Sequence, residues 1–155
     1  MEDQPTLFLV DDDPSVLDSL RTLAQTLGLR SETYSGAEEF LTAFRNDRHG
    51  CLIVDVRMAG MSGLDLQKRL VTAGDSIPTI VITGHSDIPM SVQAMKVGAI
   101  TMLEKPFEID ALIAAIRQAL AEDARRRSER KRRAAFESRI ALLTAEEREI
   151  LNFFA

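Results

Sequence analysis

The stretch Cys51-Leu52-Ile53-Val54-Asp55, continued by Val56-Arg57-Met58-Ala59-Gly60-Met61-Ser62-Gly63, decides the fold. An apolar run ends abruptly in one carboxylate and passes into a loop that contains Gly and Ser. This pattern predicts a buried parallel strand that delivers Asp55 to its carboxyl-terminal edge. In open α/β sheets, that edge is where ligands bind.

Three further apolar runs lead to residues that can carry chemistry. Leu7–Val10 runs into three consecutive aspartates, Asp11–Asp13. Ile77–Thr83 ends in a hydroxyl, and Ile100–Leu103 is followed closely by Lys105. If these runs are parallel neighbours, their carboxyl ends bring acids, a hydroxyl and an ammonium to one sheet edge. That combination is far more specific than any one of the residues alone.

Helical patterns separate the strands. Asp13 before a proline predicts a capped first helix, and Ser62 is the expected cap of the third. The polar segment Arg30–Tyr34 is typical of an edge strand, and Ser35 with Glu38 forms a capping-box pattern ahead of the second helix. Five alternations of strand and helix predict an α/β, flavodoxin-like, doubly wound parallel sheet of five strands in the order 2-1-3-4-5.

Charge divides the chain near Ala124. The residues up to that point carry 10 basic and 19 acidic side chains, whereas the residues after it carry 9 basic and 5 acidic ones. No Gly or Pro occurs from Ala121 onward, so we expect the fifth helix to extend beyond the domain surface. We predict a globular domain over 1–123, a basic helical linker over 124–143 and a separate last segment over 144–155.

The arginines of the linker have two interpretations. They could contact the phosphate backbone of a nucleic acid. We favour a solvated linker helix, because no aromatic residues are interleaved with the arginines.

Composition excludes several classes of protein. Hydrophobic residues make up 45% and charged residues 28% of the chain, and no apolar run reaches the roughly 20 residues of a membrane helix. The acidic start, Met1–Gln4, lacks the apolar core of a signal peptide. We therefore expect a cytoplasmic protein without a membrane partner. The single cysteine, Cys51, cannot form an internal disulfide and is interpreted as a core residue.

Carboxylates that converge at one sheet edge repel one another, and a hard divalent cation with oxygen ligands relieves the repulsion. Mg²⁺ fits best, since it takes one or two carboxylates and keeps positions for water and phosphate. We expect Asp12 and Asp55 to be direct ligands and Asp11 to act through water. The backbone carbonyl of Arg57 is the fourth expected ligand.

An aspartate beside such a cation can accept a phosphoryl group and form an acyl phosphate. Thr83 and Lys105 would then stabilise the phosphoryl oxygens. Asp13 is interpreted as a helix cap rather than a ligand. His85 is given no catalytic role.

The four motifs at the sheet edge resemble those of a two-component response regulator of the FixJ-like subgroup, whose output is of the LuxR type. The resemblance covers residues 6 to about 123. It is carried by Val10-Asp11-Asp12-Asp13, Asp55-Val56-Arg57-Met58, Ile82-Thr83-Gly84-His85 and Glu104-Lys105-Pro106-Phe107.

The resemblance implies a receiver domain and a role for each site residue. Asp55 would take a phosphoryl group from a partner histidine kinase, with magnesium held by Asp11 and Asp12. Thr83 and Lys105 would sense the phosphoryl group. Such a protein is a phosphoacceptor switch rather than an enzyme, and we expect phosphorylation to drive homodimerisation. The resemblance also implies a cis Lys105-Pro106 peptide bond.

Two positions depart from the family pattern. Ala59 stands where a proline is usual, which indicates a modest loosening of the loop. Met102 stands where the family commonly has a Phe or Tyr that rotates on phosphorylation, so Met102 becomes the candidate switch residue. Residues 143–151 are similar to the first helix of a LuxR-type DNA-binding domain. The chain therefore looks like a truncated transcriptional regulator that binds DNA only in its full-length form.

Two other functions stay open at this stage. A phosphatase of the haloacid dehalogenase type is one, because Asp11-Asp12-Asp13-Pro14-Ser15 loosely fits its Asp-x-Asp-x-Ser/Thr loop. That interpretation leaves Asp55 without a role. The other is a receiver whose output is protein binding or phosphorelay, against which the LuxR-like segment argues.

Overall fold

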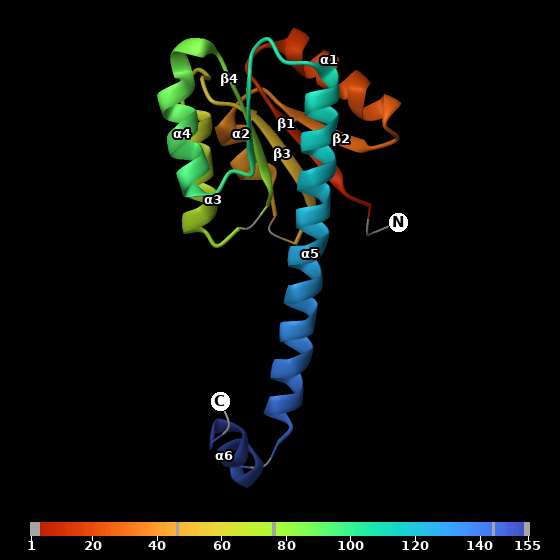
Figure 1. Cartoon of the computed structure of the whole chain (residues 1–155), viewed down its shortest axis with the longest axis vertical. Helices are drawn as coiled ribbons and strands as arrows, with labels where there is room; N and C mark the ends of the chain where they lie inside the picture. The colour runs from red at the N-terminus through yellow and green to blue at the C-terminus, as the bar shows by residue number, and fades with distance from the viewer. Residues whose placement is uncertain (1–3, 46, 76, 144, 154–155) are drawn as a thin grey trace. The chain divides into compact units, whose positions relative to one another are not determined.

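A parallel sheet forms the centre of the fold. The computed structural model describes residues 4–45, 47–75, 77–143 and 145–153. The strands are β1 (Thr6–Val10), β2 (Arg30–Tyr34), β3 (Gly50–Asp55), β4 (Thr79–Thr83) and β5 (Thr101–Glu104). Their order is β2-β1-β3-β4-β5, which confirms the predicted topology (Figure 1). Because β1 pairs with both β2 and β3, the two acidic strand ends are neighbours.

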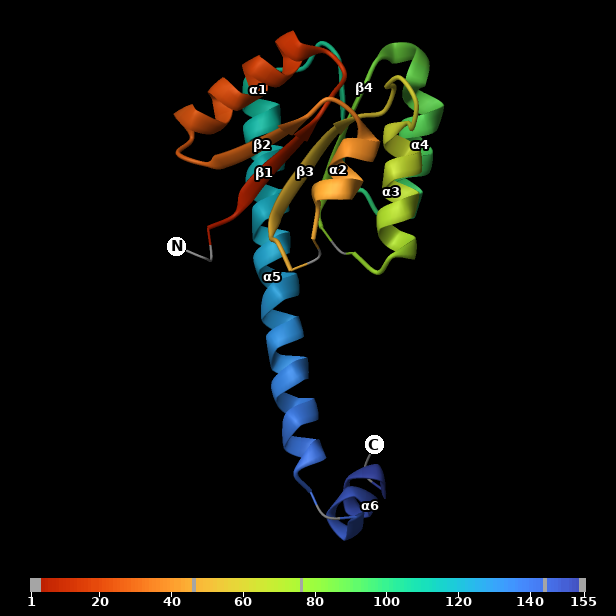
Figure 2. The same ribbon diagram turned by 180° about the vertical axis from the view of Figure 1, so that it is seen from behind.

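Helices cover both faces of the sheet. The helices of the described chain are α1 (Pro14–Thr26), α2 (Ala37–Ala43), α3 (Gly63–Thr72), α4 (Ile88–Val97), α5 (Ile109–Ala141) and α6 (Ala145–Phe153), with a 3₁₀ helix, η1 (His85–Asp87), before α4. α1 and the first part of α5 cover one face, whereas α2, α3 and α4 cover the other (Figures 1 and 2). This arrangement is that of a doubly wound α/β fold.

The alternation of side chains along the strands builds a core on each face. Phe8 and Val10 of β1 join the core under α2, α3 and α4. Leu7 and Leu9 join the core under α1 and α5. Cys51 is buried in the second core, as predicted. β1 is therefore anchored from both sides, which holds its carboxyl end in a fixed position.

Two helix starts agree with the predicted caps. The Asp13 carboxylate accepts a hydrogen bond from the Ser15 N–H at 2.9 Å. The Ser62 hydroxyl accepts one from the Asp65 N–H at 3.0 Å. The prediction for α2 was wrong, since the helix follows Gly36 and the Ser35 hydroxyl donates to Glu39 instead, at 2.6 Å. The start lies one residue later than the capping-box pattern indicates, so the acid that Ser35 reaches is also one residue later.

The second part of α5 and all of α6 belong to a second unit of structure. The chain forms two compact units, which meet in sequence between Asp123 and Ala124. α5 continues without a break to Ala141, as the lack of Gly and Pro predicts. α6 presents exposed apolar side chains, including Ile150 and Phe153. Within the described parts of the chain, no helix combines the length and apolarity needed to cross a membrane.

Gly63 lets α3 begin directly beside the end of β3. A Cβ atom at this position would lie 2.6 Å from the Asp55 carbonyl oxygen and 2.9 Å from the Val56 Cα. Both contacts are with backbone, which cannot rotate away. The Gly63 N–H also donates to the Val56 carbonyl at 2.9 Å. Glycine at this position therefore permits the close approach that positions the loop after Asp55.

We predict that Gly63→Ala lowers the free energy of unfolding by on the order of 2 kcal/mol or more, because the added methyl overpacks fixed backbone. Urea denaturation measures the change. Gly36→Ala is the matched control, since a Cβ atom added there would meet nothing within 4 Å and the backbone is extended. Equal stability of the Gly63 variant and the wild type would contradict the close approach.

Candidate functional site

Four strand ends meet at the carboxyl edge of the sheet. Asp11 directly follows β1, Asp55 ends β3, Thr83 ends β4 and Lys105 directly follows β5. The register aligns Val10 with Val54, Asp55 with Ile82, and Thr83 with Glu104. The sheet thus brings the predicted acids, hydroxyl and ammonium to neighbouring positions.

Asp55 is a nearly buried carboxylate with a donor on each oxygen. Its side chain is 10% exposed. Oδ1 accepts a hydrogen bond from the Arg57 N–H at 2.9 Å, and Oδ2 accepts one from the Lys105 ammonium at 2.7 Å. Lys105 is held in turn by its own N–H, which donates to the Thr83 carbonyl at 2.7 Å. The peptide bond from Lys105 to Pro106 is cis, as the resemblance implies.

The Asp55 carboxylate controls the protonation of Lys105. Partial burial alone would lower the pKa of the Lys105 ammonium. The hydrogen bond and the charge of Asp55 outweigh that effect, with smaller contributions from Asp11 and Asp13, and the pKa is raised above its ordinary value. Lys105 is therefore a permanent positive charge facing the acidic edge.

Asp11 is the least satisfied acid of the site. It is 2% exposed, and Oδ1 accepts a hydrogen bond from the Asp13 N–H at 2.9 Å. Its Oδ2 has no hydrogen-bond partner among the described residues. Burial, reinforced by the charges of Asp55 and Asp12, raises the pKa of Asp11 to about 6 despite the opposing effects of the Asp13 N–H and Lys105. A cation at this point would supply the missing partner.

Asp12 links two loops. Its side chain is exposed, and Oδ2 accepts a hydrogen bond from the Ala59 N–H at 3.0 Å. Proline has no N–H to donate, so this link depends on the departure from the family pattern at residue 59. The sequence shows that this N–H is available, because residue 59 is alanine and every residue other than proline has a backbone N–H.

The donor set fits Mg²⁺ in chemistry, although no closed cage exists. Across the ranges that the structure describes, no three His, Cys, Asp or Glu side chains are gathered as ready metal ligands. Mg²⁺ does not need such a cage, because it retains several waters and binds one or two carboxylates. The unsatisfied oxygen of Asp11 and the mutual charge of Asp11, Asp12 and Asp55 are the features that favour it.

Thr83 and Met102 occupy neighbouring strands. Thr83 is fully buried, and its hydroxyl donates to the Gly84 carbonyl at 3.0 Å. This bond holds the hydroxyl at the start of the connection to α4. Met102 is half-buried on β5 and pairs with Val81 of β4.

An ion pair between Arg57 and Asp87 is the feature that sequence reasoning missed. The Arg57 Nε–H donates to Asp87 Oδ1 at 2.7 Å, and Asp87 is only 7% exposed. The hydrogen bond from Arg57 lowers the pKa of Asp87. The Asp87 side chain makes no capping bond with α4. No local pattern signals the pair, because 30 residues separate its members.

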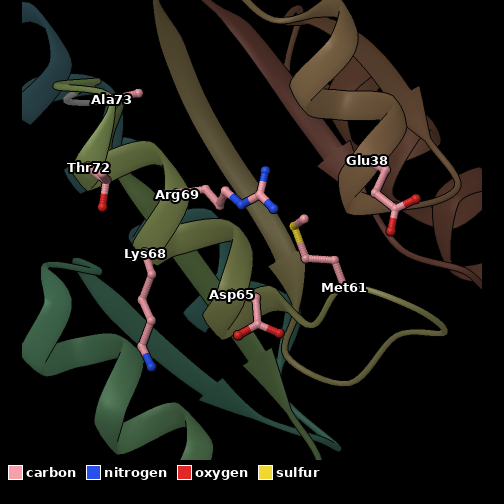
Figure 3. Close-up of a pocket in the computed structure, with 7 residues that line it drawn as sticks. All are labelled: Glu38, Met61, Asp65, Lys68, Arg69, Thr72 and Ala73. Atoms are coloured by element: carbon pink, nitrogen blue, oxygen red, sulfur yellow. The ribbon is translucent and has the colours of Figure 1, made fainter.

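A hollow of about 730 Å³ lies elsewhere, between α2 and α3. Figure 3 shows Arg69 pointing from α3 toward the side of Met61 and Glu38, with the Met61 side chain directed back toward Arg69, whereas Lys68 points away from them. Two acidic side chains, Glu38 and Asp65, and two basic ones, Lys68 and Arg69, line it. None of the predicted site residues lines it, so it is separate from the acidic edge.

Comparison with known proteins identifies this arrangement. Residues 7–117 match the family model described as response regulator receiver domain. The chain is 42% identical over 147 residues to the response regulator protein TodT of Pseudomonas putida, covering 95% of this chain and 65% of that protein. It is 40% identical over 152 residues to the transcriptional regulatory protein FixJ of Azorhizobium caulinodans, covering 98% of this chain and 72% of that protein.

Solved structures of response regulators are similar to this chain as well. The structure of the response regulator StyR matches with a TM-score of 0.90 and 46% identity, covering 97% of this chain and 76% of that one. The crystal structure of FixJ-N matches with a TM-score of 0.71 and 43% identity, covering 78% of this chain and 96% of that one.

The fold and the relatives together argue against the hypothesis of a phosphatase of the haloacid dehalogenase type. The second aspartate of that loop motif, Asp13, accepts hydrogen bonds from both the N–H and the hydroxyl of Ser15, as a helix cap does. Response regulators are regulatory proteins rather than enzymes in the ordinary sense. The chain spans about two thirds of the length of TodT, at 65%. It belongs to the response regulator receiver domain family of two-component signalling systems.

Proposed function

We propose that Asp55 accepts a phosphoryl group from a sensor histidine kinase in a magnesium-dependent reaction. The observation that carries the proposal is the Asp55 carboxylate, held between the Arg57 N–H and the Lys105 ammonium beside the unsatisfied oxygen of Asp11. An oxygen of Asp55 would form a bond to phosphorus while the bond from phosphorus to the donor nitrogen of the kinase breaks. The electron pair of that bond returns to the nitrogen, and the product is an acyl phosphate.

The residues around Asp55 would each have one task. Asp11, Asp12, Asp55 and the Arg57 carbonyl would hold Mg²⁺. When bound, this ion neutralises charge on the transferring phosphoryl oxygens. Asp13 keeps one oxygen of Asp11 fixed through its N–H, and Ala59 does the same for Asp12. This fixed orientation favours cation binding, because less reorganisation is needed.

Lys105 and Thr83 would sense the phosphoryl group. The Lys105 ammonium, already 2.7 Å from Asp55 Oδ2, would move to a phosphoryl oxygen. The Thr83 hydroxyl would leave the Gly84 carbonyl to do the same. Met102, on the strand beside Thr83, would repack in place of the usual aromatic residue. These changes would bias a surface formed by α4, β5 and α5.

That surface supports homodimerisation as the response. Val92 and Met95 of α4 are 42% and 38% exposed, although both are apolar. A rearrangement that aligns these side chains with β5 and α5 would create an apolar patch for a second copy of the chain.

The longer protein would be a transcriptional regulator in the cytoplasm. In support, the relatives are called response regulators and, for FixJ, a transcriptional regulatory protein. We assign the receiver to residues 1–123, a basic helical linker to 124–143 and the start of a LuxR-type DNA-binding domain to 144–155. Base recognition commonly needs a helix set into a groove, so specific DNA binding would belong to the full-length form.

We predict that acetyl phosphate with Mg²⁺ adds one phosphoryl group to the wild type and none to Asp55→Asn, because the amide lacks the nucleophilic oxygen anion. Intact-mass measurement detects the group. Asp65→Asn, which changes an exposed acid of α3, is the control and is expected to be labelled like the wild type. Equal labelling of the Asp55 variant would show that another residue is the acceptor.

We predict that Asp11→Asn stabilises the metal-free protein at pH 7.5 by on the order of 2 kcal/mol. The pKa of Asp11 is raised from 3.8 to about 6, so the folded state binds more protons than the unfolded state between these values. The contribution of Asp11 to the free energy of unfolding therefore falls as pH rises through that window. Urea denaturation at pH 4.5 and 7.5, with and without Mg²⁺, tests this.

Mg²⁺ should stabilise the wild type at pH 7.5 and stabilise Asp11→Asn much less, since the variant has lost part of the repulsion that the ion relieves. If the metal-free variant were no more stable than the wild type at pH 7.5, the electrostatic cost assigned to Asp11 would be wrong.

We predict that phosphorylation promotes dimerisation of the wild type, and that Lys105→Ala accepts phosphate but dimerises roughly tenfold more weakly because the sensing cation is absent. Analytical ultracentrifugation with and without acetyl phosphate measures the association. Lys68→Ala, an exposed lysine of α3, is the control. Undiminished phosphate-dependent association of the Lys105 variant would remove Lys105 from the switch.

A further inference from the structure

The Arg57–Asp87 ion pair joins two loops that border Asp55. Arg57 lies in the loop after β3, and Asp87 ends η1 directly before α4. The guanidinium donates through Nε to Asp87 Oδ1 at 2.7 Å. The side chain of Arg57 is 70% exposed, whereas that of Asp87 is 7% exposed. The pair therefore has a solvated cationic end and a buried anionic end.

Arg57 is also bonded to the acceptor residue. Its backbone N–H donates to Asp55 Oδ1 at 2.9 Å. A single residue thus contacts the acceptor carboxylate through its backbone and the start of α4 through its side chain. Asp87 raises the pKa of the Arg57 guanidinium most strongly, and the charge of Asp55 raises it as well. Both carboxylates therefore attract the same guanidinium, and its hydrogen bond is with Asp87.

Asp87 is built into the beginning of α4. Its N–H donates to the Gly84 carbonyl at 3.0 Å, and its own carbonyl accepts the Ser91 hydroxyl at 3.3 Å. The Gly84 carbonyl also accepts the Thr83 hydroxyl. Any displacement of Asp87 therefore moves the first turn of α4 and the connection that holds Thr83.

α4 contributes two small buried side chains and the partly buried Met90 to the core. Its buried residues are Ser91 and Ala94, whereas α1 buries Leu17 and Leu20 and α3 buries Leu66 and Leu70. Small side chains remove little apolar surface from water. The position of α4 is consequently sensitive to a single charged contact at its start.

We propose that the Arg57–Asp87 pair is a positioning link that couples negative charge at Asp55 to the conformation of the first turn of α4. The inference rests on the proposed phosphorylation of Asp55 and names the contact that transmits it. A phosphoryl group adds negative charge that draws the guanidinium away from Asp87. A buried carboxylate without its partner is strongly unfavourable, so the start of α4 moves until Asp87 is solvated or paired again.

Hydrogen exchange of the α4 amides, followed by mass spectrometry, tests the link. In the wild type, acetyl phosphate with Mg²⁺ is expected to speed exchange in α4 roughly tenfold, the factor that loss of one charge-assisted hydrogen bond makes in an opening equilibrium. In Asp87→Asn the exchange is expected to be fast before phosphorylation and to change little after it. Asp18→Asn, which breaks the exposed Asp18–Arg21 pair, is the control and should behave like the wild type.

The change in α4 hydrogen exchange on phosphorylation distinguishes a link that transmits the signal from one that only stabilises α4. If Asp87→Asn is labelled and its α4 exchange still rises as much as in the wild type, the link does not transmit the signal and the inference is wrong. A wild type that takes no phosphoryl group would contradict the proposed function instead.

A double-mutant cycle in the unphosphorylated protein tests the Arg57–Asp87 contact independently of phosphorylation. The α4 exchange of Arg57→Gln with Asp87→Asn should be close to that of Asp87→Asn alone, because both variants lack the same contact. Additive effects of the two substitutions would overturn the inference, whatever the result with phosphate. Arg57→Gln also covers the case in which Asp87→Asn fails to fold, since the Arg57 side chain is mostly exposed.

Discussion

The parallel pairing of β1 with β3 is the constraint on which the rest of the site depends. It places Asp11 and Asp55 at one buried edge, where desolvation and mutual charge disfavour ionisation of Asp11. The fold offsets this cost with donors from several elements: Lys105, the Arg57 N–H, the Asp13 N–H and the Ala59 N–H. One oxygen of Asp11 stays without a partner in the described chain. The carboxylates at this edge are therefore paired with donors whose contacts a bound cation or phosphoryl group would change.

Much of the fold could be predicted because its signals are local. Apolar runs that end in Asp55 or Asp11 mark buried strands, and alternation with helical patterns restricts the topology. A proline after Asp13 and the small Ser62 ahead of an apolar helix mark two helix starts correctly. The same reasoning failed at Ser35, where two acids follow in sequence and the helix begins one residue later than the pattern indicates. A shift of one residue lies below what a local pattern can resolve.

The site could be predicted less completely than the fold. The strand ends identified Asp11, Asp55, Thr83 and Lys105, because each follows a recognisable apolar run. Their hydrogen bonds could not be predicted, since nothing in the sequence indicates that the Thr83 hydroxyl donates to the Gly84 carbonyl. Arg57 was expected to act through its carbonyl, and its side chain was given no role. The contact with Asp87 depends on how two loops approach each other in three dimensions, which no periodicity encodes.

The distribution of burial explains why α4 is the element best suited to respond. α1 and α3 each bury leucines against the sheet, so moving either helix would expose large apolar side chains to water. α4 buries Ser91 and Ala94 and begins at a charged contact with the loop after Asp55. Moving α4 would therefore expose fewer large apolar side chains than moving α1 or α3, since Met90 is its one larger side chain packed against that core. A change of charge at Asp55 would act on the Arg57–Asp87 contact, so the proposed link ends on a helix that buries fewer large apolar side chains than α1 and α3 do.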